Sequence, residues 1–240
     1  MKKIFLSILL SFVFIRGVNA QGIFYENRNG VILTQEEYNA ISDFYWDGYQ
    51  ESLSQEEYNF LKKNGLFENE IKTALVNNSD YSLLSEAEHT TANKSLKMSM
   101  SCNTNCLVSI TLRWINLPKI RSYDILGIYL DGASPIQVNK VRVDTNKGKS
   151  EYSYDKKESI GIGTSFKLPT DVTYLDVSQL LLLENKGSIK ASYQHAKKTI
   201  TSANSKQYSF SKSGIGGVFK FNTGIQDYYD CMVGVELKMS

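Results

Sequence analysis

Acidic side chains are the first residues of this chain whose types and spacing could carry chemistry. Glycoside hydrolysis usually needs two carboxylates about 5 to 10 Å apart. Turn acids are common in β-rich proteins, so the pattern allows a carboxylate pair without selecting one. The aspartates that could supply such a pair are Asp124, Asp131, Asp144, Asp155 and Asp176.

The sequence gives little support for nucleophilic catalysis by serine and histidine or for a metal site. The chain has two histidines, His89 and His195, and neither has a ligand-type spacing to other metal-binding residues. His195 precedes Lys197 and Lys198, which predicts a solvent-facing strand position for it. No Gly-x-Ser-x-Gly elbow, HExxH helix or phosphate-binding glycine loop is present. We therefore expect no catalytic residue, no metal site and no cofactor.

Aromatic residues offer a binding chemistry instead, because exposed rings can stack on sugars or anchor a partner. Phe44, Tyr45, Trp46 and Tyr49 are clustered, and three consecutive aromatics cannot all face one core from one helix. The alternative is that these rings dock their segment on the rest of the protein. A second group, Tyr228 and Tyr229, lies between Asp227 and Asp230, where either a turn or a calcium or sugar site would suit the pattern. The candidate binding residues are Tyr45, Trp46, Tyr49, Tyr228 and Tyr229.

The three cysteines predict one disulfide and one remaining thiol. Cys102 and Cys106 can pair only if residues 103–105 form a tight turn, because an extended strand would place their Cα atoms about 13 Å apart. Such a turn makes residues 94–101 and 107–116 the arms of a hairpin. Cys231 shares strand parity with Val233 and Val235, which predicts a buried core thiol. Pairing of Cys231 with Cys102 or Cys106 is the alternative.

The N-terminal elements that would position these residues are two short helices. The segment that begins at Leu33 is nearly repeated from Leu53 onward. Thr34 and Ser54 can each cap a helix, and a glutamate three residues later, Glu37 or Glu57, completes a capping box. We predict a helical hairpin here, followed by a polar segment over residues 77–93 that is either a linker or a segment that wraps the next domain.

Beyond residue 90 the hydrophobic period changes from helical to alternating. Residues 108–114 alternate apolar with polar side chains, which is typical of a half-buried strand. Polar turns separate eight to ten such runs, including 122–130, 136–143, 159–168, 172–184, 188–201, 207–211, 217–221 and 232–239. This pattern predicts a mainly β fold, an antiparallel, jelly-roll-like β-sandwich preceded by the helical hairpin. The expected domains are 21–90 for the acidic helical hairpin with its linker and 91–240 for the sandwich.

Charge is divided unevenly between these two parts. Residues 21–90 hold 13 acids and 4 bases, whereas residues 91–240 hold 12 acids and 20 bases. The two charged faces are either simply solvated, or the basic part meets an anionic surface, or the two parts attract each other.

Residues 1–20 are typical of a secretory signal peptide. Lys2 and Lys3 precede an apolar run of twelve residues, too short to cross a bilayer that needs about 20. Val18 and Ala20 are small residues of the kind accepted by signal peptidase, so Gln21 is the expected mature N-terminus. We expect a secreted, extracellular protein without a membrane span.

The segment 113–127, together with 44–49, resembles a group of uncharacterised secreted proteins of low-GC Gram-positive bacteria. This resemblance implies a bacterial exoprotein and brings no activity, cofactor or site residue with it.

Three functions remain open from the sequence. The first is a non-enzymatic module whose sandwich binds a cell-wall polymer, a glycan or a surface protein, with no nucleic-acid partner. The second is a secreted glycan hydrolase that uses a carboxylate pair. The third is a membrane-active β-rich toxin, for which residues 159–168 and 172–183 are the candidate amphipathic hairpin.

Overall fold

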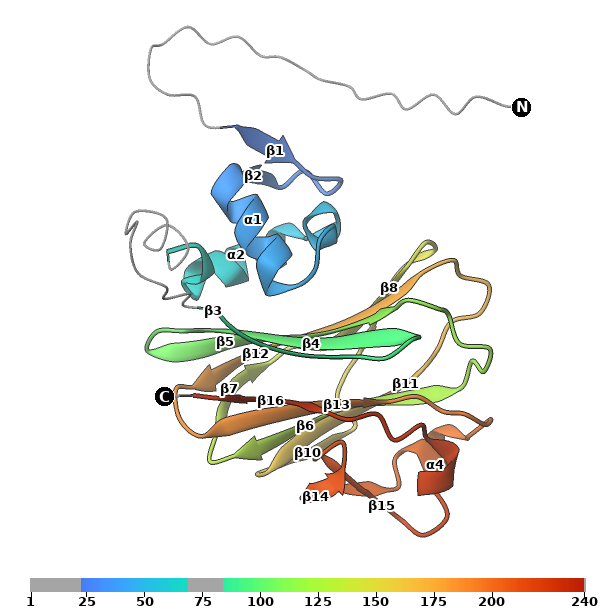
Figure 1. Ribbon diagram of the computed structural model, residues 1–240. Helices are drawn as coiled ribbons and strands as arrows, with labels where there is room; N and C mark the ends of the chain where they lie inside the picture. The colour runs from blue at the N-terminus through green and yellow to red at the C-terminus, as the bar shows by residue number, and fades with distance from the viewer. Residues whose placement is uncertain (1–22, 69–83, 240) are drawn as a thin grey trace, which may run out of the picture.

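The computed structural model describes residues 23–68 and 84–239, so the proposed signal peptide lies outside the described residues. The fold is mainly β, as predicted, with two antiparallel sheets facing each other (Figure 1). Helices lie above the upper sheet, and a short hairpin with a helical turn lies below the lower one. Within the described residues, no helix has the length and apolar composition of a membrane span.

The upper sheet has seven strands and carries the candidate site on its outer face. Its path runs β3-β4-β5-β12-β8-β9, and β7 also pairs with β12. β4 and β5 form the hairpin predicted around the cysteines, and Cys102 pairs with Cys106 at its turn. The strands span Leu84–Thr90 (β3), Lys94–Cys102 (β4), Asn105–Trp114 (β5), Pro135–Val138 (β7), Val141–Thr145 (β8), Gly148–Tyr152 (β9) and Leu175–Glu184 (β12).

The lower sheet has five strands in the order β10-β11-β6-β13-β16. Apolar residues on alternate positions of both sheets, such as Val108, Ile110, Ile128 and Ile189, form the core between them. This sandwich agrees with the period-two pattern, while the jelly-roll connectivity stays a prediction. The strands span Tyr123–Asp131 (β6), Lys156–Glu158 (β10), Gly161–Lys167 (β11), Ser188–Gln194 (β13) and Val235–Lys238 (β16).

An N-terminal unit, residues 23–68, packs on the outer face of the seven-stranded sheet (Figure 1). Both predicted capping boxes are present, at Thr34 with Glu37 and at Ser54 with Glu57. The described elements are β1 (Phe24–Glu26), β2 (Ile32–Thr34), α1 (Gln35–Phe44), the 3-10 helix η1 (Tyr49–Ser52) and α2 (Gln55–Lys63).

The four consecutive leucines of β12 explain how this unit is held. Leu181 and Leu183 point into the sandwich core, whereas Leu180 and Leu182 point outward into the apolar cluster of the N-terminal unit. Successive strand residues face opposite sides, so an uninterrupted apolar run indicates a strand buried on both faces.

A C-terminal cap, residues 196–230, covers the outer face of the five-stranded sheet. It contains α4 (Ser202–Ser205), β14 (Tyr208–Ile215), β15 (Phe219–Phe221) and the 3-10 helix η2 (Gln226–Tyr228). Aromatic rings of the cap pack directly on glycines of the sheet. A Cβ added at Gly127 would lie only 2.1 Å from the Phe219 ring, and one added at Gly161 would lie 2.3 Å from the Phe210 ring. The outer surfaces of the two sheets are therefore both partly covered.

Several predicted boundaries are wrong. Residues 84–90, assigned to the linker, form the edge strand β3, whose polar composition suits a strand with an exposed face. The single strand predicted over residues 136–143 is two strands, β7 and β8. The candidate toxin strands, β11 and β12, lie in different sheets and are largely buried, so they do not form an exposed amphipathic hairpin in this fold.

The cysteines bear out one prediction and overturn another. Cys102 and Cys106 form the predicted disulfide, with Cα atoms 4.1 Å apart. Cys231 is free and exposed rather than buried. Its φ of 57° is left-handed, so the chain is not extended there and the strand parity that predicted burial does not apply.

Candidate functional site

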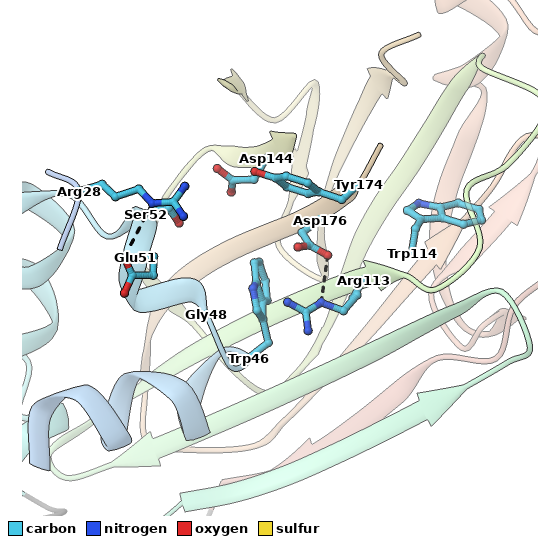
Figure 2. Close-up of a pocket in the computed structure, with 10 residues that line it drawn as sticks. All are labelled: Arg28, Trp46, Gly48, Glu51, Ser52, Arg113, Trp114, Asp144, Tyr174 and Asp176. Atoms are coloured by element: carbon cyan, nitrogen blue, oxygen red, sulfur yellow. Dashed lines mark hydrogen bonds and ion pairs between the residues drawn. The ribbon is translucent and has the colours of Figure 1, made fainter. Parts of the chain in front are cut away.

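An open cleft of about 490 Å³ lies where the N-terminal unit meets the seven-stranded sheet (Figure 2). The N-terminal wall comes from the β1–β2 turn, the end of α1 and η1. The opposite wall comes from the ends of β5, β8 and β12. The lining residues are Arg28, Trp46, Gly48, Glu51, Ser52, Arg113, Trp114, Asp144, Tyr174 and Asp176.

Three aromatic residues line the cleft, Trp46, Trp114 and Tyr174, and Trp114 is the most buried of them. Tyr174, just before β12, is 45% exposed. Trp46 follows the end of α1, where Tyr45 leaves helical geometry and turns the chain, and Trp46 remains partly exposed. Figure 2 shows these two side chains on either side of Asp176. Rings of this kind offer a flat apolar face with a polar atom at one end.

Arg113 joins the aromatic and acidic parts of the cleft. Its Nε lies 3.3 Å from Asp176 Oδ1, and its guanidinium carbon lies 5.5 Å from the centre of the Trp46 ring. Its Nη2 also donates to the carbonyl oxygen of Asp47 at 3.3 Å. The predicted alternation of β5 places Arg113 on the outer face of the sheet, and that face is the floor of the cleft.

Beneath the cleft, Arg142 of β8 links the sandwich to the N-terminal unit. Its Nη1 lies 2.9 Å from Glu57 Oε2, its Nη2 donates to Ser52 Oγ at 2.9 Å, and its Nε lies 2.6 Å from Asp144 Oδ2. The Tyr49 hydroxyl donates to Glu57 Oε1 at 2.8 Å. This network fixes the wall of the cleft through charge-assisted hydrogen bonds.

Asp144 and Asp176 are paired across β8 and β12. Burial raises the pKa of Asp144, and Arg142 opposes that shift. Burial likewise raises the pKa of Asp176, with Arg113 acting against it. Two of the five candidate aspartates thus share one cleft, and each has an arginine beside it.

The predicted aromatic binders are separated by the structure. Trp46 lines the cleft, but Tyr45 and Tyr49 are buried and stack on each other with centroids 3.9 Å apart. Tyr229 is also buried, stacked on Phe221 in the C-terminal cap, and Tyr228 is partly buried beside it. The idea that Tyr45, Tyr49 and Tyr229 present exposed rings is therefore wrong, because these residues lie in apolar clusters that dock the outer units.

His195 is not the solvent-facing residue that the sequence predicted. Its side chain is 12% exposed, and Nδ1 lies 2.9 Å from Oδ2 of the buried Asp124, which also accepts a hydrogen bond from Tyr193. The Trp114 ring packs edge-on against it. No serine or cysteine among the described residues is hydrogen-bonded to His195, so this pair lacks an adjacent nucleophile.

Sequence reasoning missed Arg28, Glu51, Arg113 and Tyr174. Arg28 and Tyr174 lie in loops, Glu51 in η1 and Arg113 in β5, and only the docking of the N-terminal unit brings the four together. The sequence signals for that docking are the aromatic cluster at residues 44–49, the uninterrupted leucines 180–183 and the opposite charges of the two parts, and none of them indicates which polar residues meet. No group of three or more His, Cys, Asp or Glu in the described part of the chain could hold a metal ion.

Comparison with known proteins adds no family to this picture. No protein-family model matches the chain, and a search of curated proteins finds no matching sequence. The function is therefore inferred from the chemistry of the cleft.

Proposed function

We propose that this chain is an exported, non-enzymatic module that binds a cell-surface glycan in the cleft between its N-terminal unit and its sandwich. The observation that carries the proposal is the convergence of Trp46 and Tyr174 with arginine and aspartate side chains around an open hollow of about 490 Å³. Ligand sites combine apolar surface with a few placed polar groups in this way.

The chemistry of a sugar suits both kinds of group. The C–H faces of a pyranose ring pack on aromatic faces, and its hydroxyls exchange hydrogen bonds with carboxylates and guanidinium groups. Arg113 and Asp176 present such groups beside Trp46. The buried Arg142 network holds Asp144 in a fixed position, so little ordering is needed when a ligand binds.

Export is supported by two features. Residues 1–20 have the charge and apolar pattern of a signal peptide. Cys102 and Cys106 form a disulfide, and disulfides persist mainly in oxidising compartments.

The test is retention on a glycan array, comparing the unaltered protein with Tyr174→Ala and Trp46→Ala. Loss of a stacking ring is expected to weaken retention by about tenfold, which corresponds to about 1.4 kcal/mol. Tyr154→Ala is the matched control, because Tyr154 is 43% exposed and does not line the cleft, whereas Tyr174 is 45% exposed and does. Equal retention of Tyr174→Ala and Tyr154→Ala would exclude the cleft as the binding site.

A second candidate function, glycan hydrolysis, is favoured by Asp144 and Asp176 alone. They face each other in one cleft, and burial raises the pKa of each. Their arginine partners favour the charged carboxylates, however, and a general acid must hold a proton. If Asp176→Asn abolishes release of reducing ends from a bound glycan, hydrolysis is the correct function. If no glycan is cleaved by the unaltered protein, binding alone stands.

A further inference from the structure

A second hollow of about 360 Å³ lies on the other side of Trp46. It extends over β4 and β5, and it shares Trp46 and Arg113 with the first cleft. Its lining residues are Ser42, Asp43, Tyr45, Trp46, Asp47, Glu88, Ser95, Lys97, Thr111 and Arg113.

Trp46 and Arg113 therefore stand between two hollows. Arg113 is held beside the Trp46 ring by Asp176 on one side and by the Asp47 carbonyl on the other. Trp46 and Arg113 therefore form a fixed ridge that separates the two hollows. A ligand longer than one hollow would have to cross the ridge with its chain against Trp46.

The charge of the combined surface is negative, although the β region as a whole is basic. Three cations line the two hollows, Arg28, Lys97 and Arg113. Six carboxylates line them, namely Asp43, Asp47, Glu51, Glu88, Asp144 and Asp176.

The cations are already engaged by the protein. Arg28 lies 3.8 Å from Glu51, Arg113 pairs with Asp176, and Lys97 pairs with Glu86 at 2.8 Å. In the described part of the chain, no ion pair involves the exposed carboxylates of Asp43 and Asp47. Glu51 and Asp176 are engaged in the same pairs and Asp144 pairs with Arg142, so the carboxylates left for a ligand are those of Asp43, Asp47 and Glu88 in the second hollow.

From these observations we propose that the two hollows are subsites of one groove, which takes an amine-bearing glycan chain lying across Trp46. This inference rests on the proposed glycan-binding function and names the class of glycan. Protonated amino groups pair with Asp43 and Asp47 in the second hollow, and a sugar ring of the same chain packs on Tyr174 in the first. Ammonium groups also interact favourably with the faces of Trp and Tyr rings.

The same charge distribution disfavours an anionic polymer. Like charges placed opposite each other weaken binding to a wrong partner. The basic excess of residues 91–240 lies outside this groove, so the overall charge of the β region does not describe its binding site.

The experiment is calorimetric titration of the full-length exported form with glucosamine oligomers of increasing length and with their N-acetylated counterparts. At low salt, the long amine-bearing oligomer is expected to bind about tenfold more tightly than either the short one or the long acetylated one. Equal affinity for amine and acetylated oligomers would overturn the amine preference. Affinity independent of length would overturn the second subsite.

The double variant Asp43→Asn/Asp47→Asn tests the second hollow directly. It is expected to bind the long amine-bearing oligomer only as tightly as the long acetylated one. Folding should not suffer, because both residues are exposed near the C-terminal end of α1, where negative charge is unfavourable. Asp227→Asn, which removes an exposed acid of the C-terminal cap, is the control.

Failure of this inference and failure of the proposed function give different results. If glucosamine oligomers do not bind but another glycan is retained through Tyr174, the amine-bearing class is overturned and glycan binding stands. If no glycan of any class is retained by the unaltered protein, both proposals are overturned.

Discussion

Arg142 is a buried charged residue that joins the sandwich to the N-terminal unit. It comes from the basic sandwich, its side chain is only 6% exposed, and it lies between Glu57 of the acidic N-terminal unit and Asp144. A buried ion pair need not stabilise a protein relative to an apolar replacement, but loss of one partner leaves a buried charge unmatched.

Replacing Glu57 tests this dependence. Glu57→Gln keeps the size of the side chain but removes the charge that faces Arg142 and Tyr49. We expect a loss of about 3 kcal/mol in the free energy of unfolding, as for other broken buried pairs, measured by urea denaturation. Glu56→Gln is the control, since Glu56 is exposed in the same helical turn. Equal stabilities of the two variants would show that Arg142 does not need Glu57.

The same carboxylate predicts a pH dependence. Burial works to raise the pKa of Glu57, but Arg142 and hydrogen bonds from Ser54 and Tyr49 outweigh it and lower the pKa below the ordinary 4.5. A lowered pKa in the folded state means that the unfolded chain binds the proton more readily. The stabilisation is therefore complete well above pH 4.5 and is lost as the pH falls through the lowered value.

Urea denaturation of the unaltered protein and of Glu57→Gln across this range measures that effect. The difference between their free energies of unfolding should be largest near neutral pH and should shrink below about pH 4.5. Asp176 titrates in both proteins with the same neighbours, so its contribution largely cancels, whereas the Glu57 charge also raises the pKa of Asp144. A difference that grows on acidification would contradict the assignment.

At the scale of elements, the glycines of the five-stranded sheet fix the C-terminal cap. Gly127 of β6 lies directly under the Phe219 ring, with no room for a Cβ. Gly127→Ala should therefore cost about 1 to 3 kcal/mol, the usual penalty for overpacking, in thermal or urea unfolding.

The double variant Gly127→Ala/Phe219→Leu provides the control for that cost. Leucine is shorter than phenylalanine, so the added methyl group would no longer meet a ring. The double variant should lose less free energy of unfolding than the sum of the losses in the two single variants, because the two residues are in direct contact. Additive losses would mean that the two residues act independently.

The elements that local sequence dictates were predictable. The capping boxes at Thr34 and Ser54 need only residues three positions apart, and β5, β6 and β11 follow from alternation within a few residues. Features that need distant contacts were not predictable. The His195–Asp124 contact joins residues 71 positions apart, and the exposure of Cys231 follows from a left-handed backbone that alternation does not encode.

The site was predictable only in part, because it too depends on contacts between residues that are distant in the sequence. Trp46, Asp144 and Asp176 were among the candidates because their residue types suit binding chemistry. Nothing local distinguished Asp144 and Asp176 from Asp131 or Asp155, since the pairing of β8 with β12 decides which acids meet.

At the scale of the whole molecule, four layers are stacked: the N-terminal unit, the seven-stranded sheet, the five-stranded sheet and the C-terminal cap (Figure 1). Of the three interpretations of the charge asymmetry, attraction within the molecule receives direct support from the ion pairs Arg142–Glu57 and Lys97–Glu86, which join basic residues of 91–240 to acids of 21–90. The groove exists because the first layer covers the second only partly.

The layered arrangement predicts that neighbouring leucines of β12 have different roles. Leu181→Ala should leave a cavity in the sandwich core, whereas Leu182→Ala should leave one under the N-terminal unit. Each is expected to cost about 2 to 5 kcal/mol if unfolding is fully cooperative. Limited proteolysis separates the two, because opening of one layer need not open the others.

For Leu182→Ala, cleavage should begin in residues 23–68 while the sandwich fragment survives, and glycan retention should fall because one wall of the groove is displaced. For Leu181→Ala, cleavage should reach both sheets together. The chemical change is the same in the two variants and the residues are adjacent, so the difference can come only from the layer that each leucine faces. Identical cleavage patterns would mean that the N-terminal unit and the sandwich unfold as one cooperative body, and the groove would then be a rigid feature rather than a boundary that can open.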